Sequence, residues 1–202
     1  MSENPQNDSL RSPLLMNRHD TGLVVIDVQQ KLIPLVQDHL LSCWNISRLI
    51  RGCKILNIPV LATEQYPTGL GNTIDSLSSL LTEVDSPFLE KTMFSCRGLS
   101  SEFEKLENSG IHNLIITGVE SHVCVLQSAL DLISQGFDVF VPVDAIGSRY
   151  PIDHETALCR LEISGATLVS TEMVLFELCE RSGTPEFKEI SRLVKEELPA
   201  EN

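Results

Sequence analysis

The chain has 202 residues, of which 42% are hydrophobic and 21% charged, the composition of an ordinary globular protein with room for a full core. Its formal net charge of −13 disfavours phosphate backbones and anionic membranes as partners. No apolar run approaches the length of a membrane span. We therefore expect that neither nucleic acid nor a membrane is the main partner.

The organisation of the chain favours one domain over residues 20–202, because no linker rich in Pro, Gly or Ser divides it. Residues 1–19 lack the long apolar segment of a secretory signal, and we interpret them as a flexible N-terminal tail. Six cysteines form no C-x-x-C pair or metal knuckle, which indicates free thiols in the reducing cytoplasm.

Strand and helix patterns alternate along the chain. Short apolar runs predict strands at 21–27, 59–62, 87–96, 114–117, 138–143 and 166–170. Helical spacing of apolar residues predicts helices at 41–56, 99–106, from 123 to the glycine at 136, and at 153–164, 171–180 and 185–197, with a weaker helical segment at 76–81. This order predicts an α/β fold, a three-layer, Rossmann-like and mostly parallel sheet with helices on both faces.

Three reactive side chains fall at the predicted carboxyl ends of strands, where sites in such sheets lie. Asp27 ends the first strand, Lys91 lies in or just past a short one, and Cys124 follows the strand at 114–117. Taken singly, these would be read as a helix cap, a solvated charge and a small core residue. Together they supply a base, a cation and a nucleophile, the groups that acyl transfer through a thiolate needs.

Cys124 is predicted to lie in the first turn of a helix, where unpaired backbone N–H groups favour thiolate over thiol and could stabilise an oxyanion. His122 could pair with Cys124, but residues two apart at a helix start tend to point to different sides. Ser121 lacks the glycine that a nucleophile elbow requires two positions later. The dinucleotide fingerprint, the phosphate loop and the zinc-protease helix are also missing, so we expect no cofactor.

Three blocks of sequence carry a resemblance to a known family. They are V-V-I-D-V-Q-Q at 24–30, E-K-T-M-F-S-C at 90–96 and G-V-E-S-H-V-C-V-L-Q at 118–127. In order and spacing they resemble the signature blocks of isochorismatase-like cysteine hydrolases. T-E-Q-Y-P-T-G-L-G at 63–71 and P-E-F-K-E-I at 185–190 resemble in particular the eukaryotic isochorismatase domain-containing proteins.

The resemblance implies roles for residues in these blocks. Cys124 would be the nucleophile, Asp27 the proton acceptor and Lys91 the third member of a triad. It also implies a cis peptide between Val119 and Glu120 that turns backbone N–H groups toward an oxyanion. The expected reaction is hydrolysis of a small amide or related C–N carbonyl compound through a thioester on Cys124.

Two departures from the family pattern narrow the substrate. Nicotinamidases of the superfamily have an aspartate and a nearby histidine as metal ligands after the second strand, whereas this chain has T-E-Q-Y-P-T-G, so we expect no catalytic metal. Lys31 and Leu32 replace an aspartate and an aromatic residue of their first block, which disfavours nicotinamide. True isochorismatases lack the cysteine nucleophile, so Cys124 also disfavours vinyl-ether cleavage.

The substrate pocket and the assembly are further expectations. Candidate pocket walls are Gln30, Glu64, Gln65, Tyr66 and Phe94, and each could instead be loop packing. Relatives commonly form dimers or larger homo-oligomers, and the final helix or the apolar stripe near Leu175 and Leu178 could supply the interface. Two alternatives remain: a partner-binding protein without turnover, and a thiol redox sensor in which Cys96 or Cys159 resolves an oxidised Cys124.

Overall fold

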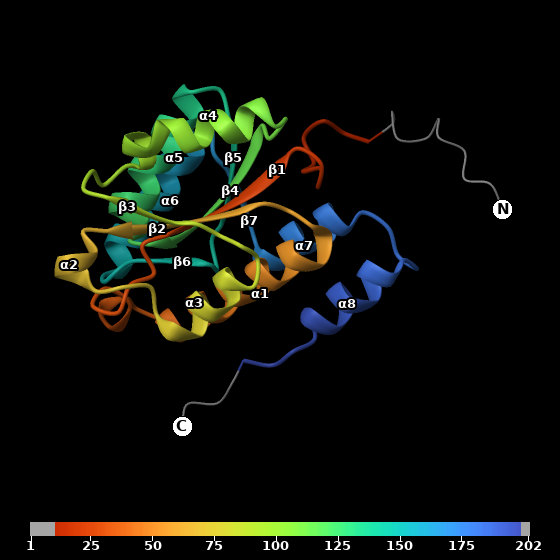
Figure 1. Ribbon diagram of the computed structural model, residues 1–202, viewed down its shortest axis with the longest axis horizontal. Coiled ribbons are helices and arrows are strands. Elements are labelled where there is room, and N and C mark those ends of the chain that lie inside the picture. The colour runs from red at the N-terminus through yellow and green to blue at the C-terminus, as the bar shows by residue number, and fades with distance from the viewer. Residues whose placement is uncertain (1–10, 199–202) are drawn as a thin grey trace.

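The computed structural model describes residues 11–198, and its centre is one parallel sheet in the strand order β3-β2-β1-β4-β5-β7 (Figure 1). A short strand, β6, pairs with the end of β4. The strands are β1 Thr21–Ile26, β2 Val60–Gln65, β3 Phe88–Lys91, β4 Asn113–Val119, β5 Asp138–Pro142, β6 Ile146–Gly147 and β7 Thr167–Val169. The predicted α/β class and parallel pairing are confirmed.

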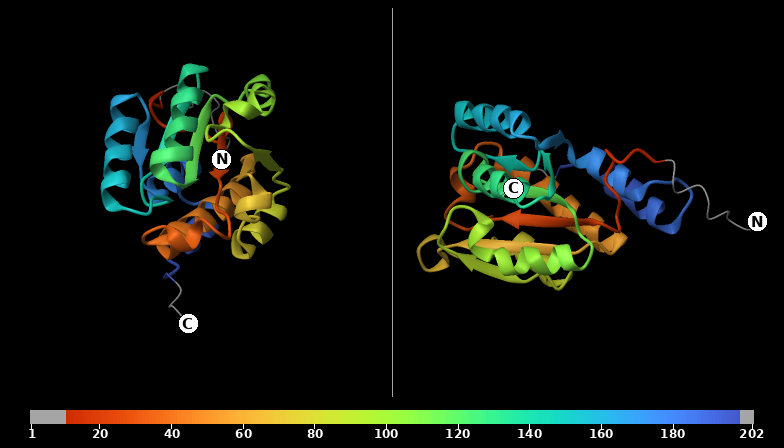
Figure 2. Two further views of the ribbon diagram at one scale, coloured as in Figure 1. Left: turned by 90° about the vertical axis from the view of Figure 1, so that its left-hand side faces the viewer. Right: turned by 90° about the horizontal axis from the view of Figure 1, so that it is seen from above.

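Helices cover both faces of the sheet, as the edge-on view shows (Figure 2). One face is covered by α4 Ser100–Asn108, α5 Leu126–Ser134 and α6 Pro151–Ile163. The other is covered by α1 His39–Leu56, α3 Asp75–Thr82, α7 Thr171–Cys179 and α8 Pro185–Leu193. Short segments complete the chain: α2 Pro67–Leu70, 3-10 turns η2 Ile33–Leu35 and η3 Cys96–Leu99, and the π-helical turn η4 Ser121–Val125. Within residues 11–198, no helix is long and apolar enough to cross a membrane.

The continuous apolar run of β1 is explained by its central place in this sheet. Side chains of a strand alternate between its faces. Leu23 and Val25 pack into the core beneath α1 and α7, whereas Val24 and Ile26 pack into the core beneath α5. All six residues of β1 are buried, which is why hydrophobic residues occupy successive positions.

Two boundaries differ from the prediction in ways that affect the site. β2 runs to Gln65 and does not stop at residue 62, so Glu64 and Gln65 are strand residues and not loop residues. Both are polar yet buried, because side chains and backbone of neighbouring segments satisfy them. The strand β6 has only two residues and was missed. Its length gives too little periodicity to recognise.

Residues of the predicted N-terminal tail pack against the folded domain, although the sequence analysis placed the start of the domain at residue 20. Residues 1–10 of the predicted tail lie outside the described residues, but residues 11–19 lie against α7. Met16 is completely buried, and its backbone N–H donates to the Glu177 carboxylate at 3.1 Å. The Arg11 guanidinium donates to the carbonyl oxygens of Met16 at 2.8 Å and Glu177 at 2.6 Å. Among the described residues, packing therefore extends back to Arg11, ahead of residue 20.

Candidate active site

The three reactive residues meet at the carboxyl edge of the sheet. Asp27 follows β1, Lys91 is the last residue of β3, and Cys124 lies in the turn η4 that connects β4 to α5. β1 lies beside β4 and one strand away from β3, so residues distant in sequence converge there. Asp27 is completely buried, and Lys91 and Cys124 are each 5% exposed. The site is thus set into the fold rather than on its surface.

Asp27 and Lys91 form a buried ion pair. The Lys91 ammonium donates to Asp27 Oδ2 at 2.6 Å, and the Thr63 hydroxyl donates to Asp27 Oδ1 at 2.7 Å. Lys91 Nζ also donates to Gln65 Oε1 at 2.8 Å and to the Phe94 carbonyl oxygen at 2.9 Å. A buried charge is stable only when it is paired and hydrogen-bonded, and both conditions hold here.

The surroundings of Cys124 favour its neutral thiol over the thiolate. Burial raises the pKa of the Cys124 thiol well above its ordinary value, and the negative charge of Asp27 and a hydrogen bond to Asp27 raise it further. The positive charge of Lys91 opposes this by lowering the pKa. Burial therefore opposes the thiolate that the helix start was expected to favour.

This arrangement can transfer a proton as it forms a nucleophile. The Asp27 carboxylate acts on the pKa of the Cys124 thiol at close range, which places it to accept the thiol proton when the sulfur attacks. Lys91, against the same carboxylate, keeps a compensating positive charge beside the reacting groups. A thiol activated only at the moment of attack does not carry an unsolvated negative charge at rest.

The segment before Cys124 is held by residues that the sequence analysis did not assign to the site. The peptide bond between Val119 and Glu120 is cis. The Glu120 carboxylate accepts hydrogen bonds from the backbone N–H of Arg149 at 3.2 Å and from its Nε at 3.0 Å. Arg149 lies in the loop between β6 and α6, so this contact joins the nucleophile turn to a loop remote in sequence.

Two histidines flank the same turn. Ser121 Oγ lies 3.0 Å from His154 Nδ1, and His122 Nδ1 lies 3.0 Å from Ser148 Oγ. Burial lowers the pKa of His154, although Glu155 opposes the shift. Both histidines hold serine side chains in these contacts, so His122 anchors η4 to the loop before α6. No local motif marks His154, because its partner is 33 residues away.

Among the predicted pocket walls, Glu64 and Gln65 make contacts within the protein. The Glu64 carboxylate accepts from the backbone N–H and the hydroxyl of Thr73, at 2.7 and 2.8 Å, which fixes the loop before α3. Gln65 contacts Lys91 directly, as described above. Their buried positions in β2 explain these contacts.

The remaining predicted wall residues are solvent-exposed to different degrees. Gln30 is exposed and lies against Gly71. Phe94 is 54% exposed and contributes its carbonyl oxygen to Lys91. Tyr66 is 58% exposed and lines a cavity of about 560 Å³ together with Pro67, Lys91 and Met93. Tyr66 is therefore the wall candidate with a cavity beside it.

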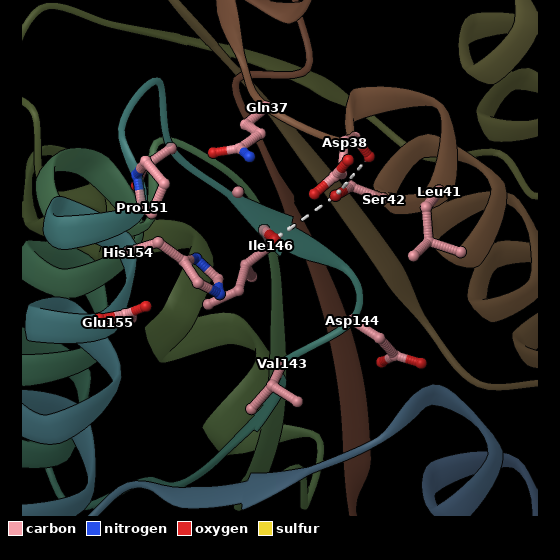
Figure 3. A pocket seen from close by; sticks show the side chains of 12 residues that line it. Gln37, Asp38, Leu41, Ser42, Val143, Asp144, Ile146, Pro151, His154 and Glu155 are labelled. Carbon is pink, nitrogen blue, oxygen red and sulfur yellow. Dashed lines mark hydrogen bonds between the residues drawn. The ribbon is translucent and has the colours of Figure 1, made fainter.

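A second cavity, of about 230 Å³, lies between the starts of α1 and α6 (Figure 3). Asp38 and Ser42 approach it from α1, and His154 approaches it from α6. Ser42 Oγ lies 3.5 Å from the Ile146 carbonyl oxygen across this space. Because His154 also contacts Ser121, the cavity adjoins the outer side of the nucleophile turn.

The two candidate resolving cysteines lie in different surroundings. Cys159 is exposed on α6. Cys96 is completely buried in the same core cluster as Cys124, and burial raises the pKa of its thiol to about 11. All six cysteines are free. Among residues 11–198, no three His, Cys, Asp or Glu side chains gather into a group that could hold a metal ion.

The chain is similar in sequence to proteins of one known family. Residues 21–173 match the isochorismatase domain. "Secreted isochorismatase effector Isc1" of Phytophthora sojae is 36% identical over 91% of this chain and 89% of its own length. "Isochorismatase domain-containing protein 1" of Danio rerio is 40% identical over 86% of this chain, which spans only 60% of that relative.

A solved structure extends the similarity to three dimensions. The structure described as MAR1 ribonuclease from Caenorhabditis elegans is 36% identical and superposes with a TM-score of 0.84. The match covers 92% of this chain and 95% of the other.

Proposed function

Because the chain belongs to the isochorismatase domain family, we propose that it is a hydrolase that cleaves a C–N bond of a small amide or related carbonyl compound through Cys124. The observation that carries the proposal is the buried cluster in which the Cys124 thiol, the Asp27 carboxylate and the Lys91 ammonium meet. A nucleophile beside a base and a compensating cation is the set that covalent acyl transfer requires.

In the proposed mechanism, Asp27 takes the thiol proton while the Cys124 sulfur attacks the carbonyl carbon. The resulting oxyanion is stabilised by backbone N–H groups of the turn η4, which carries Cys124 and directly follows Val119 and Glu120. Asp27 then gives its proton to the departing nitrogen, which leaves a thioester on Cys124. Asp27 next accepts a proton from water as the water attacks the thioester, and it returns that proton to the sulfur as the acid leaves.

Lys91 acts in this mechanism through its charge. An ammonium has three N–H donors, and Asp27, Gln65 and the Phe94 carbonyl oxygen accept from Nζ at 2.6 to 2.9 Å. These contacts use its donors within the protein. Substrate recognition is therefore assigned to the surrounding walls, with Tyr66 beside the larger cavity as its foremost candidate and Phe94, Gln30 and Glu64 as secondary ones.

The proposal is tested by incubating the protein with a library of small amides and imides and measuring intact mass. A substrate should leave an acyl adduct that maps to Cys124, and Cys124→Ala should abolish both adduct and turnover. Cys159→Ala removes an exposed thiol and serves as the matched control. If no compound is turned over and none leaves an acyl adduct on Cys124, the alternative of a partner-binding protein without turnover is favoured.

Ribonuclease activity is a second candidate, because the C. elegans structure of similar fold carries that description. The net charge of −13 opposes it, since RNA affinity depends on neutralising phosphates with Lys and Arg. A labelled single-stranded RNA in the same screen separates the two candidates. Cleavage that persists in Cys124→Ala would overturn the thioester mechanism.

The cellular compartment and the oligomeric state of the protein are two further proposals. Six free thiols support a cytoplasmic location, although the Phytophthora relative is described as secreted. We propose a homo-oligomer, but Leu175 and Leu178 cannot supply its interface because they are 1% and 2% exposed inside the core. Light scattering at micromolar concentration tests the assembly, and a monomer mass would contradict it.

A further inference from the structure

Gln65 lies directly beside Lys91 on the neighbouring strand. The two residues are register partners in the parallel pair of β2 and β3. Gln65 Oε1 accepts a hydrogen bond from Lys91 Nζ at 2.8 Å. Gln65 is only 7% exposed. This contact therefore lies within the protein interior, where a hydrogen bond from a charged donor is strong.

The amide of Gln65 is fixed in one orientation. Its Nε2 donates to the Thr92 carbonyl oxygen at 2.8 Å, which leaves Oε1 facing Lys91. The backbone of Gln65 is held as well. Its N–H donates to Gln29 Oε1 at 2.8 Å, and Gln29 Nε2 donates to the Gln65 carbonyl oxygen at 3.0 Å. Gln29 follows Asp27 by two residues, so the same loop places the base and clamps Gln65.

The chemistry of an amide suits this position. An amide oxygen accepts from the ammonium without adding a negative charge, so Asp27 remains the sole side-chain anion that Lys91 contacts among the described residues. A carboxylate in the same place would compete with Asp27 for the ammonium. An apolar side chain would remove this acceptor and leave that N–H of Lys91 only the longer contact to the Met93 carbonyl oxygen, at 3.4 Å.

We propose that Gln65 is a positioning residue that holds the Lys91 ammonium against Asp27 and thereby tunes the reactivity of Cys124. The inference rests on the proposed function in taking Cys124 as the nucleophile. It replaces the sequence-based assignment of Gln65 to the substrate pocket wall. Gln65 acts through Lys91 and has no contact with the reacting sulfur in this account.

The test is the pH dependence of Cys124 alkylation by iodoacetamide, followed by peptide mass spectrometry. Lys91 lowers the pKa of the Cys124 thiol, so a misplaced ammonium should make the thiol harder to ionise. In Gln65→Met, which keeps the side-chain length but removes the acceptor, we expect the alkylation rate at pH 8 to fall about tenfold. The midpoint of the profile should move to higher pH.

Matched variants separate positioning from general packing. Gln135→Met makes the same exchange at an exposed residue and should leave the profile unchanged. Gln65→Asn is too short to reach Lys91 and should reproduce the effect of Gln65→Met, which keeps the test decisive if the latter fails to fold. In a Lys91→Met background, Gln65→Met should add nothing, because its effect passes through Lys91.

Two results would overturn the inference. One is an unchanged alkylation profile in folded Gln65→Met and Gln65→Asn, and the other is an equal effect with and without Lys91. Because alkylation requires no substrate, these results are distinct from failure of the proposed function. That failure would appear as a wild-type Cys124 whose alkylation does not depend on Asp27 and Lys91.

Discussion

The carboxylate of Asp27 is completely buried, and three neighbouring groups compensate its charge. The Lys91 ammonium and the Thr63 hydroxyl donate to its two oxygens, and the Cys124 thiol shares the same site. Removing one partner from such a set leaves an uncompensated charge in a medium of low dielectric. The stability of the fold and the chemistry of the site therefore depend on the same contacts.

Lys91→Met should lower the free energy of unfolding by about 3 to 5 kcal/mol at pH 7, because it leaves Asp27 buried without its ion partner. Urea denaturation measures this loss. The double variant Asp27→Asn/Lys91→Met removes both charges, and Asn tolerates the left-handed φ of 52° at this position. The double variant should recover part of the loss, and equal destabilisation of the two variants would contradict the ion-pair account.

At the residue scale, the sequence predicted which residues converge but not how each is used. Asp27 and Cys124 follow the buried strands β1 and β4, and Lys91 ends the edge strand β3, positions that local patterns reveal. The partners of Gln65 and Glu64 lie in other segments, and the ionisation of Cys124 depends on burial that only the assembled fold produces. Tertiary contacts of this kind leave no local signal.

Among the elements, β4 approaches β1 closely at Gly118. Gly118 has a φ of 118°, and a Cβ atom placed there would lie 2.0 Å from the Ile26 carbonyl oxygen. Only glycine combines this φ with such an approach of two backbones. Because Asp27 follows Ile26 and the turn η4 follows β4, this contact sets the spacing between Asp27 and Cys124.

Gly118→Ala should therefore lower the free energy of unfolding by about 3 kcal/mol or more, since strain at φ adds to a backbone clash. Gly110→Ala is the control, because Gly110 also has a positive φ of 91° but nothing lies within 4 Å of a Cβ there. The control should cost only about 1 kcal/mol. Thermal or urea unfolding measures both, and similar losses would show that close approach is unimportant.

Long elements were predicted more accurately than short ones. The helix at 41–56 is α1 with a start two residues earlier, because an apolar stripe over four turns is unambiguous. The predicted end of the second strand, at residue 62, was too early because the last three residues of β2, Thr63, Glu64 and Gln65, are polar. Their burial is explained only by partners on β1, β3 and the loop before α3.

For the molecule as a whole, buried thiols make the free energy of unfolding fall as the pH rises in the alkaline range. Burial raises the pKa of Cys53 to about 12 and that of Cys96 to about 11. In the unfolded chain these thiols ionise near their ordinary value of 9.0, so above that pH the unfolded state binds fewer protons than the native state. Stability is then fully present below about pH 9 and falls as the pH rises.

We expect the free energy of unfolding to fall between pH 8 and pH 10 by about 1 kcal/mol for each of these two thiols. Cys53→Ala should weaken this decrease, although it also costs stability at pH 8 by leaving a cavity. Cys159→Ala, at an exposed thiol, should leave the decrease unchanged. A free energy of unfolding that is constant over this range would contradict the raised pKa values.

The parallel sheet and its two helical layers were predictable because hydrophobic periodicity and chain order determine them. The packing of residues 11–19 was not predictable, because the burial of Met16 depends on α7. Glu177 of α7, which accepts a hydrogen bond from the Met16 backbone N–H, is 161 residues away in the sequence. The substrate specificity of the site could not be predicted either, because segments far apart in sequence form its cavities.

The proposed role of Asp27 is to make Cys124 a nucleophile. It is tested most directly by treating the protein at pH 7 with a limiting amount of iodoacetamide and locating the label by peptide mass spectrometry. We predict that the exposed Cys159 is labelled before Cys124, because burial raises the pKa of the Cys124 thiol, and that Asp27→Asn slows the labelling of Cys124 further, because the proton acceptor is lost. Labelling of Cys124 that is unchanged or faster in Asp27→Asn would contradict this role.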